Sequence, residues 1–194
     1  LRNGRQDLFL SNAFSLFTRQ ALGPMFGLCA LPRETEGVAR MARHLEVKLA
    51  LPRASTLCFH WRGEDFHHPA QLAKQRMPRN ASSGAYVARA LVRRAKRLGA
   101  EGILLLTNAR YEALSEMLGA LRTSGVRAES PRVLRESSTF GCQSRYVYGT
   151  MAEMLTCSRM RHYAGTPGSS FSDHIAAMRR ARGHNSSTDA PLYV

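Results

Sequence analysis

Lysine is scarce in this chain of 194 residues: only three of its 28 basic residues are lysines, so the other 25 are arginines. Acidic residues are also few, at 14, which leaves a formal net charge of +14. The four cysteines lack CxxC spacing, which argues against a zinc site. No apolar run is long enough to span a membrane, and no internal repeat is visible. The length and composition therefore favour one folded domain with a cationic, arginine-rich surface.

Cysteine and histidine usage gives no sign of a reactive centre. Cys58 and Cys157 fall in segments expected to face the core, where we predict free cysteines that behave as small hydrophobic residues in a reducing compartment. His60, His67 and His68 have few acidic residues nearby, so we expect no metal. No Ser/His/Asp triad can be assembled from the sequence order, and no cofactor is expected.

Apolar runs that alternate between strand-like and helix-like spacing organise most of the chain. The pattern predicts helices at 34–49, 84–98, 111–124, 144–160 and 173–182, and strands at 56–61, 102–107, 126–129 and 162–165. Strands and helices alternating in this way indicate βαβ units. We therefore expect an α/β fold, a three-layer Rossmann-like domain with a mostly parallel sheet at 34–183. A partly helical N-terminal extension (1–33) would precede it, and an extended C-terminal tail (184–194) would follow.

The segment 165–172 is rich in glycine and serine and lies between a predicted strand and a predicted helix. Such turns bring backbone N–H groups and hydroxyls together, which suits a phosphate. Ser169, Ser170 and Ser172 could each donate to a phosphate oxygen. The alternative is that these serines only cap the helix.

Arg62 and Asp65 come just after the predicted strand 56–61. Ligands of open α/β sheets bind outside the carboxyl ends of the strands, where the planar fork of an arginine suits a pyrophosphate. The alternative is a surface ion pair between Arg62 and Asp65 that has no function.

Three segments recur in the order and spacing of a known family: HWRGEDF at 60–66, EMLTCSR at 153–159 and GTPGSSFSDHI at 165–175. The first is similar to a His-x-Arg-x-x-Asp-Phe segment, and the other two to a final nucleotide-binding block. Together they resemble the protein O-fucosyltransferase family, including its plant and algal relatives. Such transferases have two Rossmann-like halves, and the resemblance covers about 34–183 as the C-terminal, donor-binding half.

The resemblance implies roles for individual residues. Arg62 would contact the GDP phosphates and promote departure of GDP, and Asp65 would support its loop. The full set implied to bind the sugar nucleotide is His60, Arg62, Asp65, Glu153, Ser169, Ser170, Phe171 and Ser172. Two positions depart from the family: Glu153 stands where Asp is common, and Asn108 follows Thr107 where the family tends to have Asp.

Arginine clusters form a second candidate surface, for RNA or an acidic protein partner. The predicted contacts are Arg89, Arg93, Arg94, Lys96, Arg97, Arg179, Arg180 and Arg182. The alternative is a solvated surface on which a GC-rich coding sequence has replaced lysine with arginine.

Two functions from different classes follow. In the first, the domain has an O-fucosyltransferase-like fold but is not catalytic by itself, and serves as a basic subunit of a larger assembly of proteins, plausibly a mitochondrial ribonucleoprotein such as the mitochondrial ribosome. In the second, it is the donor-binding half of an active enzyme that transfers fucose from GDP-fucose, with inversion, to a Ser or Thr hydroxyl. The expected location is mitochondrial for the first and the lumen of the endoplasmic reticulum or Golgi for the second.

Overall fold

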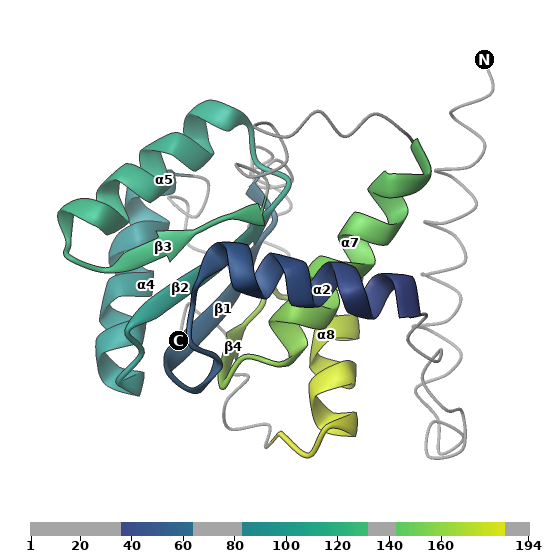
Figure 1. Cartoon of the computed structure of the whole chain (residues 1–194). Coiled ribbons are helices and arrows are strands. Elements are labelled where there is room, and N and C mark those ends of the chain that lie inside the picture. Colours follow the sequence, from purple (N-terminus) through teal and green to yellow (C-terminus); the bar gives the residue numbers. More distant parts are fainter. Residues whose placement is uncertain (1–35, 64–82, 132–142, 185–194) are drawn as a thin grey trace. The chain divides into compact units, whose positions relative to one another are not determined.

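The computed structural model of this chain describes residues 36–63, 83–131 and 143–184 (Figure 1). All of them belong to one compact unit, Thr35–Val194. The predicted N-terminal extension and nearly all of the predicted tail lie outside the described residues, as do Asp65, His67 and His68. The proposed domain limits therefore stay predictions.

The described residues form a four-stranded sheet in which all the pairings are parallel, with the order β3-β2-β1-β4. The strands are β1 (Thr56–Trp61), β2 (Gly102–Thr107), β3 (Arg127–Glu129) and β4 (His162–Ala164). β1 lies between β2 and β4, and its six residues are all buried. The predicted α/β fold is thus confirmed, and the sheet is wholly parallel where a mostly parallel one was expected.

Helices cover both faces of the sheet (Figure 1). They are α2 (Glu36–Leu49), α4 (Gly84–Leu98), α5 (Tyr111–Thr123), α7 (Gln143–Ser158) and α8 (Ser170–Ala181), with a 3-10 turn, η2 (Arg53–Ser55), before β1. α4 and α5 pack on one face, while α7 and α8 pack on the other with the end of α2. Among the described residues, no helix combines the length and the apolar character needed to cross a membrane.

The alternation of side chains along β1 explains the two cores. Leu57, Phe59 and Trp61 face α4 and α5, whereas Cys58 packs with side chains of α7 and α8. Because both faces are covered, the strand is apolar at almost every position rather than at alternate ones. The two polar exceptions are Thr56, at the start of the strand, and His60, with 6% of its surface exposed.

Candidate functional site at the carboxyl edge of the sheet

Two threonine hydroxyls hold the backbone at the carboxyl end of β1. Thr166 Oγ1 donates to the carbonyl of His60 (2.8 Å) and accepts from the amide of Arg62 (3.1 Å). On the β2 side, Thr107 Oγ1 donates to the carbonyl of Trp61 (2.6 Å). The backbone at Trp61 and Arg62 is therefore held on one side by the end of β2 and on the other by the turn that follows β4.

The turn between β4 and α8 depends on close backbone approach. A Cβ atom at Gly165 would lie 2.6 Å from the Tyr163 hydroxyl, and Gly168 has a φ of 71°, a conformation that favours glycine. Ser169 is the N-cap, because its side chain accepts from the amide of Ser172 (3.4 Å). α8 therefore begins at Ser170, three residues before its predicted start, and its first turn lies at the carboxyl edge of the sheet.

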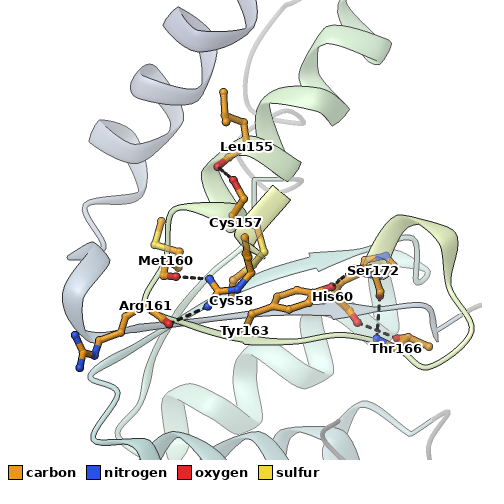
Figure 2. Close-up of a disulfide and its surroundings, with 11 residues drawn as sticks. Cys58, His60, Leu155, Cys157, Met160, Arg161, Tyr163, Thr166 and Ser172 are labelled. Carbon is orange, nitrogen blue, oxygen red and sulfur yellow. Dashed lines mark hydrogen bonds between the residues drawn. A yellow bond between two sulfur atoms is a disulfide. The ribbon is translucent and has the colours of Figure 1, made fainter. Parts of the chain in front are cut away.

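The imidazole of His60 is hydrogen-bonded to this segment through the side chain of Ser172 (Figure 2). Its Nδ1 lies 2.7 Å from Ser172 Oγ, and that oxygen accepts from the amide of Thr166 (3.0 Å). The His60 ring packs against Phe171 in a tilted arrangement, with 4.4 Å between the ring centroids. Burial, with a further contribution from the nearby charge of Arg62, lowers the pKa of His60 to about 3. The imidazole is therefore neutral at physiological pH and serves as a hydrogen-bonding support for the turn.

The predicted sugar-nucleotide residues divide by exposure. His60, Ser169 and Ser172 are buried. Arg62, Glu153, Ser170 and Phe171 retain some exposed surface, and Asp65 lies outside the described residues. The serine hydroxyls that were candidates for a phosphate are thus not equivalent: Ser169 caps the helix and Ser172 holds His60, whereas Ser170 stands at the start of α8.

The structure shows two contributors that sequence reasoning did not single out. They are Thr166, described above, and Tyr163, whose hydroxyl donates to the carbonyl of Ser172 (3.1 Å). Thr166 lies inside the glycine- and serine-rich segment 165–172. Its position two residues past the end of β4 could have indicated a place at the carboxyl edge of the sheet. The inward direction of Tyr163 follows from strand alternation, but its partner becomes visible only in the folded chain.

Cys58 and Cys157 form a disulfide, so the prediction of two free cysteines is wrong. Figure 2 shows the bond between the two sulfur atoms. The Cα atoms are 5.5 Å apart, and both side chains are fully buried. Both residues were expected to face the core, but 99 positions separate them, and only the packing of α7 on β1 brings them together. The bond ties the strand that leads to Arg62 to the helix that carries Glu153, one turn before Cys157.

Arg179 is not a surface contact, contrary to the prediction. Its side chain is fully buried and donates to the carbonyls of Met160 and Arg161, the latter at 3.0 Å. Its guanidinium carbon lies 5.7 Å from the centre of the Tyr163 ring. The reason is helical phase, because Arg179 follows the buried Ile175 by four residues. The guanidinium satisfies carbonyls just beyond the end of α7 and is unavailable to an acidic partner.

The other predicted basic contacts keep their access to solvent. Exposed are Arg89, Arg93, Lys96, Arg97, Arg180 and Arg182, while Arg94 is partly buried. Within the described part of the chain, no group of three or more His, Cys, Asp or Glu side chains is arranged to hold a metal ion.

Comparison with known proteins supports the fold and leaves the function open. No protein-family model matches the sequence, and no curated protein matches it. The fold is similar to crystal structures of POFUT1, in complex with GDP-fucose (TM-score 0.51, 14% identity) and in its apo form (TM-score 0.50, 13% identity). Each alignment covers 80% of this chain and 45% of the POFUT1 chain. The chain thus has an O-fucosyltransferase-like α/β fold and spans less than half the length of the solved proteins.

Proposed function

We propose that this domain binds the diphosphate of GDP-fucose, or of a closely related GDP-sugar, as the donor-binding half of a protein O-fucosyltransferase. One observation carries the proposal: the hydroxyl of Thr166 joins the backbone of Arg62 to the turn that begins α8. An arginine and a helix N-terminus therefore share one edge of the sheet.

That edge suits a diphosphate for two physical reasons. The first backbone N–H groups of α8, including those of Ser170 and Phe171, have no carbonyl partner within the helix, and the helix dipole favours an anion there. Arg62 adds a guanidinium that can donate two parallel hydrogen bonds to phosphate oxygens. The predicted contacts of Arg62, Ser170 and Phe171 are consistent with their partial exposure.

The chemical role of this half would be electrostatic. When a Ser or Thr hydroxyl of the acceptor attacks the sugar carbon, the bond to GDP breaks and negative charge develops on the leaving diphosphate, which Arg62 would stabilise. A proton must also leave the acceptor hydroxyl, and a His60 pKa of about 3 makes that imidazole a poor proton acceptor near neutral pH. The acceptor groups and the base would then come from the second half that the resemblance implies.

The fully buried disulfide supports a location in an oxidising compartment, because such bonds persist in secretory lumens and are rare where thiols are kept reduced. We therefore favour the lumen of the endoplasmic reticulum or Golgi over the mitochondrial alternative.

Calorimetric titration of the oxidised chain with GDP and GDP-fucose tests the proposal. Arg62→Ala should weaken GDP binding roughly 10- to 100-fold, the value of a charge-assisted hydrogen-bond pair. Arg122→Ala is the matched control, because Arg122 is an exposed arginine at the far end of α5 and should leave the affinity unchanged. Absence of GDP binding, or equal binding by the Arg62 variant, would refute the proposal.

A second function, the basic subunit of a ribonucleoprotein, is favoured by one specific observation. Arg89, Arg93, Lys96 and Arg97 are all exposed, and their spacing places them along one stripe of α4, opposite the buried Leu91. Such a stripe matches the phosphate backbone of an RNA.

Salt dependence of RNA binding tests this second function. A triple Arg89→Gln, Arg93→Gln, Arg97→Gln variant should bind a single-stranded RNA more weakly, and its salt slope should fall by about 0.7 for each phosphate that the protein no longer neutralises. The matched control is a triple Arg40→Gln, Arg43→Gln, Arg122→Gln variant, which removes three exposed arginines of α2 and α5 and should lower the slope less. An unchanged slope in the triple variant would count against the RNA role.

A further inference from the structure

Thr166 occupies a special place relative to the β1–β4 ladder. The last pair in that ladder is Phe59 opposite Ala164, and continuing the register by two residues sets Thr166 opposite Trp61. In a regular parallel ladder, the backbone of a residue opposite Trp61 would bond to the carbonyl of His60 and to the amide of Arg62. The chain leaves the ladder before it reaches this point, yet both hydrogen bonds are present.

The side chain of Thr166 makes them. Its hydroxyl donates to the carbonyl of His60 and accepts from the amide of Arg62, at 2.8 and 3.1 Å. One side chain thus replaces the missing ladder backbone.

The backbone of Thr166 is thereby released for the turn. Its amide donates to Ser172 Oγ (3.0 Å), and its carbonyl accepts from the amide of Ser169 (3.3 Å). Thr166 is also buried, with 2% of its surface exposed, so water does not compete for these bonds. Thr166 thus bonds to the end of β1 through its side chain and to the residues at the start of α8 through its backbone.

We propose that Thr166 is a positioning residue that sets the distance between Arg62 and the N-terminus of α8, so that both meet the same diphosphate. This inference rests on the proposed GDP-sugar site and adds the residue that aligns its two parts. Thr166 itself need not touch the ligand, because it acts on the Arg62 amide and on the turn. Threonine suits the role because its β-branch restricts the side chain to few rotamers.

Thr56 provides a control at the opposite end of β1. It is fully buried, and its hydroxyl donates to the carbonyl of Pro52 (2.6 Å). This bond involves neither the backbone of Arg62 nor the turn before α8. Loss of the Thr56 hydroxyl should therefore affect stability without moving the two parts of the site.

Calorimetric titration with GDP, inorganic pyrophosphate and guanosine tests the inference on the oxidised full chain. Thr166→Val should weaken GDP and pyrophosphate binding by about the same factor, close to tenfold, and leave guanosine binding unchanged. Thr166→Ser keeps the hydroxyl and should remain within about twofold of the wild type. Thr56→Val should lower the melting temperature and keep the GDP affinity.

Three outcomes would overturn the inference: wild-type affinity in Thr166→Val, a loss of affinity in Thr166→Ser as large as that in Thr166→Val, or an equal loss in Thr56→Val. If Thr166→Val does not fold, as judged by circular dichroism, Thr166→Ala takes its place in the same comparison.

Hydrogen exchange separates this inference from the proposed function. If the wild-type chain binds no GDP or pyrophosphate, the proposed function fails, and the link from Thr166 to Arg62 is then read from the exchange rate of the Arg62 amide by NMR. Thr166→Val should speed that exchange about tenfold, since the amide loses its acceptor, whereas Thr56→Val should not. An unchanged rate in Thr166→Val would refute the link itself.

Discussion

Acidification should destabilise this domain through His60, which is 6% exposed and whose pKa is lowered from 6.5 to about 3, mainly by burial. Between these two values the unfolded chain binds more protons than the folded domain, so the free energy of unfolding falls as the pH drops from 6.5 toward 3. From pH 7 to pH 5 the loss due to His60 alone is about 2 kcal/mol, and this figure holds for any folded-state pKa below about 4. The stabilising effect of the neutral imidazole is fully present above pH 6.5.

The variant His60→Asn isolates this effect, because an asparagine amide does not titrate and can still meet Ser172 Oγ. Urea denaturation at pH 7 and pH 5 should show the wild type losing about 2 kcal/mol more than the variant. Burial also lowers the pKa of His162 and His174 and raises that of Asp173. These groups are present in both proteins, so their contributions cancel in the comparison.

Equal losses of stability in the wild type and in His60→Asn would refute this reasoning. So would an NMR titration in which the imidazole of folded His60 protonates near pH 6.5. Either result would mean that His60 reaches water, and the support of the turn by a neutral imidazole would have to be abandoned.

Two further predictions concern the covalent and steric supports of the site. Replacing both Cys58 and Cys157 by alanine should cost up to about 4.7 kcal/mol of unfolding free energy, because the bond closes a loop of about 100 residues; urea denaturation measures the loss, and peptide mapping without reductant should recover the two cysteines linked. Gly165→Ala should cost about 1–3 kcal/mol because the added methyl would meet the Tyr163 hydroxyl. Gly119→Ala, in α5 with nothing within 4 Å of the added atom, should instead stabilise the domain by about 0.5–1 kcal/mol, and the opposite order of stabilities would contradict the steric argument.

The sheet could be predicted from the sequence because its central strands are continuous apolar runs. The bounds of β1 and β2 were predicted as observed, at 56–61 and 102–107, and α4 ends where Gly99 adopts a φ of 63°. The start of α8 could not be fixed, since Ser169, Ser170 and Ser172 all suit an N-cap. Which one accepts the hydrogen bond depends on the turn geometry that Gly165 allows, and this is a property of the folded chain.

The sequence indicated residues that lie near the carboxyl edge of the sheet but not how they contact one another. The resemblance indicates His60 and Ser172 as ligand contacts, which stays a prediction, and the structure adds a hydrogen bond between the two side chains. Arg179 could have been assigned to the core from its spacing to Ile175, because residues four apart on a helix share a face. The disulfide between positions 58 and 157 was beyond sequence reasoning, since nothing local selects one partner among four cysteines.

The hydrogen-bond network at the carboxyl edge is consistent with the proposed anion site and makes His60 unsuited to proton transfer. A base must lie free and ionisable near neutral pH, yet the imidazole of His60 is buried, neutral and engaged with Ser172 Oγ. The same bonds, through Thr166, fix the backbone of Arg62 beside the first turn of α8. Rigid donors aimed at an anion stabilise developing charge without reorganising when a leaving group departs. In the proposed reaction, His60 would therefore support the turn as a neutral imidazole and would not take up a proton.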